Sequence, residues 1–126
     1  MRRWNGWGDT TKTYPLHQGS LDFLGKYVGV GRATSSVKLA GVIAKVPQSR
    51  LPDHALITTD AEERIRHSTG QSLPDWLGFH SGHIPVFSDG VSYPLNNDDV
   101  RDLLDYARAN DVKLIPYGGG TSVVGH

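Results

Sequence analysis

The residues best suited to chemistry are three successive glycines, Gly118, Gly119 and Gly120, followed directly by Thr121 and Ser122. Glycine lacks Cβ, so this run can take positive φ and turn several backbone N–H groups toward one point. With two hydroxyls beside them, these amides form a dense group of donors suited to an anion, most naturally a phosphate. The alternative is a tight structural loop without a ligand. We favour the phosphate site because an apolar, strand-like run precedes the glycines.

Two common nucleotide-binding loops do not fit this run. A Walker loop ends in Gly-Lys-Ser/Thr, whereas Gly120 is followed directly by Thr121. The dinucleotide fingerprint Gly-x-Gly-x-x-Gly, begun at Gly118, needs a glycine where Val123 stands. The same fingerprint begun at Gly29 also lacks its third glycine. Neither a P-loop nucleotidase nor this type of dinucleotide site is therefore predicted.

The elements that must position the glycines are a strand, a helix and a second strand. Residues 91–94 form an extended run, and Asn96 is placed to cap a helix with apolar side chains at 100, 103, 104 and 107. Asn110 is expected to end this helix in the left-handed conformation. Residues 112–115 then fit a second strand. This order predicts a βαβ unit with parallel strands, whose carboxyl ends are where ligands bind.

The beginning of the chain has few regular signals. Residues 1–19 are polar and turn-rich, which predicts an irregular arm. We interpret Trp4 and Trp7 as aromatic anchors that hold this arm to the body, rather than as a substrate platform. Ser20 can cap a short helix over 21–28, which Gly29 ends.

The middle of the chain contains one clear helix signal. Thr59 and Glu62 have the spacing of a capping box, which predicts a helix over 60–68. A short helical turn is expected over 73–79. Residues 37–46 fit either a helix or a strand.

Composition and charge exclude several classes of protein. The chain has 126 residues, and a domain of that size folding alone would bury about 65–70% of its unfolded surface. Thirteen Lys and Arg balance thirteen Asp and Glu, so no net field attracts nucleic acid or an anionic membrane. Cysteine is absent, which excludes disulfides and a cysteine nucleophile. No apolar run reaches the roughly 20 residues that span a bilayer, so a cytoplasmic protein is expected.

The histidines and paired acids have simple structural interpretations. His80 and His83 could begin a metal site, but the glycine between them and the absence of a nearby acid pair favour a surface loop. Asp98 and Asp99 could be catalytic carboxylates, yet two acids in a first helical turn are explained by the helix dipole.

A third candidate is a basic group formed by Arg64, Arg66 and His67. These side chains could reach an anion. The same spacing fits a solvated helix face with an ion pair to Glu62 or Glu63, and we favour that interpretation.

Taken together, these residues resemble the vanillyl-alcohol-oxidase type, or PCMH-type, of FAD-binding domain. The pattern Pro-x-Gly-Gly-Gly-Thr-Ser at 116–122, with Pro-x-x-x-Asp-Asp-Val at 94–100, resembles the loop that binds the FAD pyrophosphate in that family. Further similarity lies in Trp-Asn-Gly-Trp-Gly at 4–8, Tyr-Pro-Leu at 14–16, and Asp60-x-x-x-Arg64 with His67 and Gly70. Within the family, the chain most resembles the alkyldihydroxyacetonephosphate synthases and bacterial FAD-linked oxidases. The resemblance covers nearly the whole chain and is weakest over 32–55.

The resemblance implies an α+β fold with two parts. An N-terminal arm and helical region, residues 1–82, would precede a βαβ unit, residues 83–126, that forms the incomplete first part of a PCMH-type FAD-binding domain. FAD would bind through the segment 116–122, here named the glycine loop. Its residues are Pro116, Tyr117, Gly118, Gly119, Gly120, Thr121 and Ser122.

The resemblance also implies noncovalent FAD, because Thr121 follows the glycines where covalently flavinylated relatives carry a histidine. His126 lies beyond the motif and has no matching role. No catalytic residue of the family and no metal ligand is expected within this chain.

The expected function is that of an N-terminal fragment of an FAD-dependent oxidoreductase. In the full-length protein, the flavin would carry out alkylglycerone-phosphate-synthase-like or 2-hydroxy-acid or alcohol oxidase chemistry on a small-molecule substrate. Alone, the fragment is expected to be inactive, to bind FAD weakly because most contacts are missing, and to self-associate through exposed apolar surface. The alternative is a self-contained small module that binds a phosphorylated ligand or a protein without catalysis.

Overall fold

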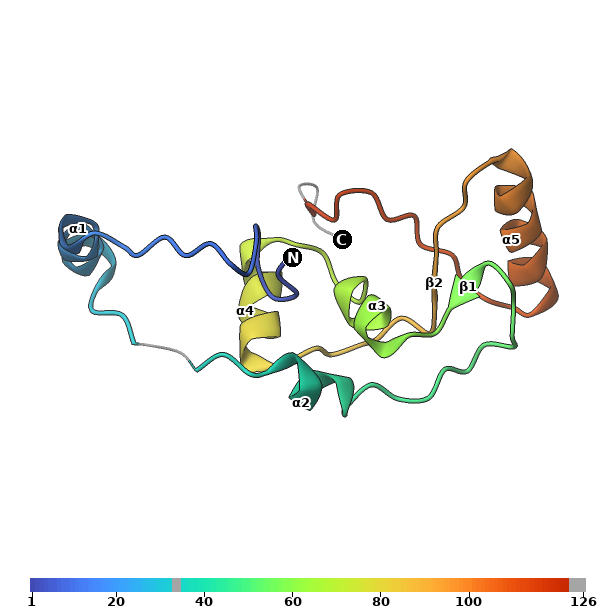
Figure 1. Ribbon diagram of the computed structural model, residues 1–126, viewed down its shortest axis with the longest axis horizontal. Coiled ribbons are helices and arrows are strands. Elements are labelled where there is room, and N and C mark those ends of the chain that lie inside the picture. The colour runs from blue at the N-terminus through green and yellow to red at the C-terminus, as the bar shows by residue number, and fades with distance from the viewer. Residues whose placement is uncertain (33–34, 123–126) are drawn as a thin grey trace.

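The computed structural model describes residues 1–32 and 35–122, so His126 lies outside the described residues. Helices α2, α3 and α4 lie in the middle of the molecule, and α1 and α5 lie at opposite ends (Figure 1). In chain order, the elements of this part are α1 (Gln18–Val28), α2 (Leu39–Ile43), β1 (Ile57–Thr58), α3 (Ala61–Arg66), α4 (Leu73–Ser81), β2 (Val91–Ser92) and α5 (Asn97–Ala109).

The hydrophobic core lies where α2, α3 and α4 meet. Val42, Ile65, Trp76 and Phe79 are each at most 7% exposed and form one cluster. Partly buried apolar side chains surround this cluster: Trp4, Val37, Leu39, Val46, Ile84 and Phe87. The core is small for a chain of 126 residues, and it draws on the arm as well as on the helices.

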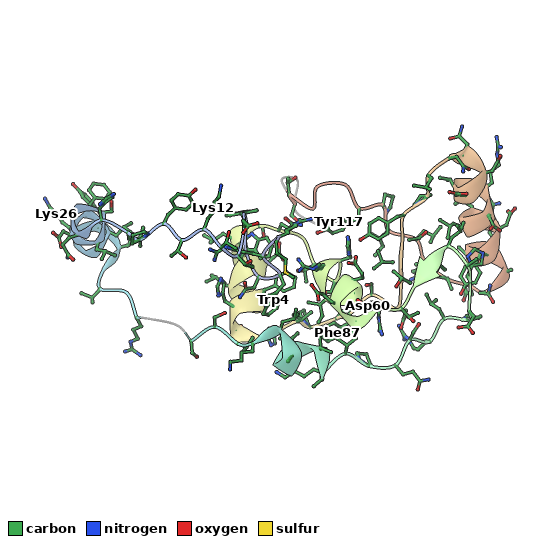
Figure 2. The ribbon with its side chains drawn as sticks, in the orientation of Figure 1. Trp4, Lys12, Lys26, Asp60, Phe87 and Tyr117 are labelled. Atoms are coloured by element: carbon green, nitrogen blue, oxygen red, sulfur yellow. The ribbon has the colours of Figure 1, made fainter. Side chains whose placement is uncertain are left out.

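The N-terminal arm is attached to this core by its tryptophans. Trp4 packs edge-on against Phe79 with ring centroids 6.1 Å apart, and Trp7 packs against Trp76 at 5.8 Å. Figure 2 shows Trp4 beside α4. The interpretation of both tryptophans as anchors is therefore confirmed.

The sheet differs from the expected arrangement. β1 and β2 pair antiparallel, with Ile57 opposite Ser92. Residues 112–115 are extended but belong to no strand of the described part, so the predicted βαβ unit is wrong for this chain. The physical reason is pairing: a strand is defined by a neighbour that takes its hydrogen bonds, and within the described part residues 112–115 have no such neighbour.

The predicted helix ends agree with the structure at some positions and differ at others. Asn96 caps α5 by accepting from the amides of Asp98 and Asp99, as expected. Asn110 stays at φ −112°, and Asp111 takes the left-handed conformation instead, at φ 52°. The predicted helix over 60–68 is α3, but Asp60 is its cap, accepting from the amide of Glu63 at 3.0 Å. The predicted capping box that begins at Thr59 is therefore wrong by one residue.

The remaining helices lie close to where the sequence places them. α1 begins before Ser20, after His17, and ends at Gly29 with φ 90°. The predicted turn over 73–79 is α4, closed by Gly82 at φ 70°. The ambiguous segment 37–46 contains the short helix α2. Element type was therefore more predictable than the exact boundaries.

The chain exposes far more surface than a compact monomer would. Its accessible surface is 9627 Å² for 13.8 kDa, whereas a compact protein of that mass exposes about 6,600 Å². Its unfolded chain would expose about 20,000 Å², so folding buries about half of that surface. The expected burial of about two thirds is therefore not reached. Helix α1 illustrates the reason, because none of its residues is buried.

The helices of the described part are short. The longest, α5, has 13 residues. A bilayer requires about 20 apolar residues in a helix. No helix among residues 1–32 and 35–122 is long and apolar enough to cross a membrane.

Candidate phosphate-binding loop

The glycine loop reaches the middle of the molecule from α5. After Ala107 accepts from the amide of Val112 at 2.9 Å, the chain runs back toward α3 and α4 (Figure 1). Tyr117 lies near α3 in Figure 2. Gly118, Gly119 and Thr121 are exposed, whereas Tyr117, Gly120 and Ser122 are half-buried. The loop thus has one face toward the protein and one toward solvent.

The loop backbone depends on glycine at one position above all. Gly120 has a φ of 65°, and a Cβ added there would lie 2.1 Å from Tyr117 Oη. Ser122, two residues later, also has a positive φ of 54°. A side chain at 120 would therefore be excluded by both conformation and space.

The other two glycines keep the exposed face open. A Cβ at Gly118 would meet no atom within 4 Å. A Cβ at Gly119 would make just an ordinary van der Waals contact, 3.6 Å from Thr121 Cγ2. Across the described residues, the amides of Gly118, Gly119 and Thr121 donate no hydrogen bond to the protein. Ser122 Oγ, by contrast, donates to the carbonyl of Gly120 at 3.3 Å. Within the described part, these three exposed amides and the Thr121 hydroxyl have no protein partner and are available to an anion.

The nearest acids are engaged in other hydrogen bonds. Asp75 Oδ2 accepts from Ser72 N at 2.9 Å and from Ser72 Oγ at 2.5 Å, which caps α4. Glu63 Oε2 accepts from Tyr93 Oη at 2.5 Å. Partial desolvation of the hydroxyl, together with this hydrogen bond, raises the pKa of Tyr93 to about 12, so Tyr93 stays a neutral donor. Among the described residues, no Lys or Arg side chain hydrogen-bonds to the glycine loop. Any positive electrostatic potential at the loop therefore comes from its backbone N–H dipoles.

Arg64 differs from its expected role. It is only 3% exposed, and it donates from Nε to the carbonyl of Ser88 at 2.6 Å and from Nη1 to that of Pro47 at 2.8 Å. The interpretation of a solvated face is therefore wrong for Arg64. Its Nη2 is buried and has no partner among the described residues. Arg66 does form the expected ion pair, with Glu62 at 2.6 Å.

His80 and the acids of α5 have hydrogen-bond partners within the described residues. His80 Nδ1 lies 3.1 Å from Ser36 Oγ, and the described residues hold no group of three potential metal ligands. Asp98 accepts from Arg101 at 2.6 Å, and Asp99 accepts from the amide of Leu95 at 2.8 Å. The interpretation of Asp98 and Asp99 as structural acids at a helix start is therefore confirmed.

Two surface hollows of about 390 Å³ each lie away from the glycine loop. One is lined by Pro52, Asp53, His54, Ala55, Ile57 and Thr59. The other extends from the same region to Arg64 and Pro47. Neither is lined by a residue of the glycine loop.

Comparison with known proteins identifies what the chain is similar to. An alkyldihydroxyacetonephosphate synthase of Trypanosoma brucei brucei is 27% identical over 98% of this chain and 25% of its own length. The Caenorhabditis elegans synthase is 24% identical over 96% of this chain and 25% of its own length. An Arabidopsis thaliana mitochondrial D-lactate dehydrogenase [cytochrome] is 29% identical over 76% of this chain and 17% of its own length. No model of a known protein family matches.

A solved structure shares the fold. A crystallised alkyldihydroxyacetonephosphate synthase superposes with a TM-score of 0.68 at 23% identity, over 98% of this chain and 29% of that one. The helices and two-stranded sheet therefore match part of a larger structure.

These similarities are to alkyldihydroxyacetonephosphate synthases and to a D-lactate dehydrogenase. The synthases are the relatives that the motifs indicated. The chain spans about a quarter of the length of these relatives.

Proposed function

We propose that this chain is the FAD-diphosphate-binding segment of an FAD-dependent oxidoreductase. The observation that carries the proposal is the open face of the glycine loop, where the amides of Gly118, Gly119 and Thr121 have no partner among the described residues. Amides held at one turn are suited to a diphosphate because they supply positive dipoles at little desolvation cost. The homology to alkyldihydroxyacetonephosphate synthases supports FAD as the ligand.

The residues present fit a diphosphate. A Cβ at Gly118 or Gly119 would occupy the open face where a phosphate oxygen must approach, while Gly120 forms the turn behind it. Thr121 offers a hydroxyl and no nucleophilic ring nitrogen, which supports noncovalent attachment. When bound, FAD would supply the redox chemistry, and the glycine loop would hold its diphosphate.

In this proposal, the flavin-dependent reaction is carried out by a longer protein that contains this chain. The relatives extend over about four times the matched length, so most FAD contacts and the substrate site would lie in sequence that is not in this chain. Alkyl transfer to a glycerone phosphate and oxidation of a 2-hydroxy acid or alcohol are the two candidate reactions. The chain alone is proposed to be inactive and to self-associate through its exposed apolar side chains.

The proposal is tested by competition at the loop. FAD fluorescence is titrated with the chain, and ADP, which carries the diphosphate, and riboflavin, which does not, are added as competitors. We expect weak, saturable FAD binding that ADP displaces and riboflavin does not. Binding that riboflavin displaces, or no binding to this chain or to the full-length protein, would contradict the proposal.

A charge placed on the open face provides a second test. Gly119→Asp adds a carboxylate without a steric clash, so FAD affinity should fall at least tenfold through repulsion of the diphosphate. The matched control is Gly25→Asp in α1, where a Cβ also meets open space. Equal losses for both variants would show that the effect is not specific to the glycine loop.

The large exposed surface of the chain disfavours the self-contained module. A compact binding module of this mass would expose about 6,600 Å², and the chain exposes 9627 Å². Sedimentation analysis separates the two cases, because the module remains a monomer as concentration rises and the proposed segment associates.

A further inference from the structure

The inner face of the glycine loop rests on a segment far away in sequence. Residues 67–72, here named the docking segment, connect α3 to α4. Gly120 accepts at its carbonyl from the amide of Gln71 at 2.5 Å, and Gln71 Nε2 donates to Tyr117 Oη at 3.2 Å. Tyr117 Oη in turn donates to the carbonyl of Thr69 at 3.4 Å. Three hydrogen bonds therefore join the loop to this segment.

Packing accompanies these hydrogen bonds. The rings of Tyr117 and His67 meet edge to face with centroids 4.8 Å apart. Gln71 is only 9% exposed, so its side-chain amide is committed to this contact rather than to water. A buried amide that lost its partner would be left unsatisfied.

The approach is closest at Gly70. A Cβ added there would lie 1.6 Å from Ser122 Oγ and 2.8 Å from Ser122 Cβ. It would also lie 3.1 Å from Asp75 Oδ2. Glycine is therefore required at position 70 by the space that Ser122 occupies, although the φ of Gly70 is not in the left-handed region.

We propose that Gly70 and Gln71 are positioning residues that fix the glycine loop in the conformation that exposes its free amides. This inference deepens the proposed function and rests on it for the identity of the ligand. A loop with three glycines can adopt more conformations than a loop of other residues. Ordering it on binding therefore costs more conformational entropy. The docking segment removes part of that freedom beforehand, so that less of it is lost when the diphosphate binds. Neither residue contacts the ligand in this account.

The direct test measures the docking without any ligand. The hydrogen exchange rate of the Gln71 amide is measured in the parent chain and in Gly70→Ala. We expect at least tenfold faster exchange in the variant, because the new Cβ displaces Ser122 and with it the Gly120 carbonyl. Gly25→Ala, at an open position in α1, should leave the Gln71 rate unchanged.

A double-mutant cycle distinguishes a local clash from general damage. Ser122→Gly removes both atoms that a Cβ at 70 would strike, so Gly70→Ala should have little further effect on Gln71 exchange in that background. Equal effects of Gly70→Ala with and without Ser122 would overturn the proposed contact.

The positioning role is then tested by FAD affinity, measured at a temperature where each variant remains folded. Gln71→Ala removes one loop hydrogen bond and Tyr117→Phe removes two, and each should weaken FAD binding about two- to tenfold. If Gln71 exchange responds as expected but FAD affinity does not, docking is real and the positioning role is wrong. If the parent binds no FAD, the proposed function fails, while the exchange cycle still decides the docking.

Discussion

Helices α4 and α5 both begin at side-chain caps, but they differ in what they pack against. α4 contributes Trp76 and Phe79, at 7% and 2% exposure, to the central core. α5 buries Leu103 and Ala107 yet leaves Val100 and Leu104 more than 40% exposed. Its polar contacts include Tyr106 Oη, which donates to the carbonyl of Pro52 at 2.7 Å. Capped helices therefore occur in two regions whose tertiary packing is unequal.

The comparison separates two sources of stability. The central region, made of α2, α3 and α4, is held by apolar burial and by Arg64. The α5 region depends more on its own helix propensity, its cap and its ion pairs, of which Arg108–Asp105 at 3.0 Å is one. In a chain with about half of its surface buried, damage to the central region should unfold the molecule, whereas damage to α5 should remain local.

The largest expected effect is the loss of Phe79. Phe79→Ala removes a ring that contacts both Trp4 and Trp76, and such core truncations cost about 3–5 kcal/mol. Urea unfolding monitored by tryptophan fluorescence should show loss of the cooperative transition, since the chain has little stability to spare. The matched variant Val100→Ala, on the exposed face of α5, should shift the midpoint only slightly. Equal shifts would contradict the distinction between the two regions.

The second effect is the removal of Arg64. Arg64→Gln leaves the carbonyls of Ser88 and Pro47 without their charged donor, and each such hydrogen bond is worth about 1.5–3 kcal/mol. The variant should unfold at clearly lower urea concentration. Arg108→Gln, which breaks an exposed ion pair on α5, should be close to neutral. If Arg64→Gln were as stable as the parent, the cost of burying Nη2, which has no partner among the described residues, would cancel the stabilisation from the two hydrogen bonds.

The contrast between Arg64 and Arg108 shows how far the sequence alone could lead. The capped helix Asn97–Ala109, the arm anchors and the similarity to alkyldihydroxyacetonephosphate synthases were predictable because their signals are local or carried by a motif. The burial of Arg64 was not, because its partners lie 17 and 24 residues away in irregular segments. The docking of Tyr117 on Gln71 spans 46 residues and has no local signature.

The predicted βαβ unit failed for a related reason. An apolar run at 112–115 indicates an extended segment, but only a neighbouring strand makes it part of a sheet. The pairing of β2 with β1 instead joins residues more than 30 positions apart, and two-residue strands carry no periodicity that could reveal it. The proposed boundary between 82 and 83 stays a prediction.

A smaller and more local effect is expected at the cap of α5. Asn96→Ala removes the acceptor for the amides of Asp98 and Asp99, which costs about 1 kcal/mol. Hydrogen exchange should quicken in the first turn of α5 while the core amides of α4 keep their protection. Asn97→Ala, one residue inside the helix, is the matched control. Faster exchange throughout the chain would mean that α5 and the central region unfold as one unit.

The smallest expected effect is the pH dependence carried by Asp89. Arg50 donates to Asp89 from Nη2 at 2.6 Å and from Nε at 3.1 Å, and this hydrogen-bonded ion pair lowers the pKa of the carboxyl. A lowered pKa in the folded state means that the unfolded chain binds the proton first as pH falls. The stabilisation is therefore complete above the usual carboxyl pKa of about 3.9 and is lost as pH falls through the lower folded value.

Asp89→Asn should remove only this acid-dependent component. Urea midpoints measured from neutral pH down to acid should fall more steeply for the parent than for the variant, and the two curves should converge at the acid end. Because Arg50 is largely exposed, added salt should reduce the difference at neutral pH. Asp105→Asn, which breaks the exposed pair on α5, provides the control and should follow the parent curve. If the parent curve ran parallel to that of Asp89→Asn, the Arg50–Asp89 pair would form without stabilising the fold.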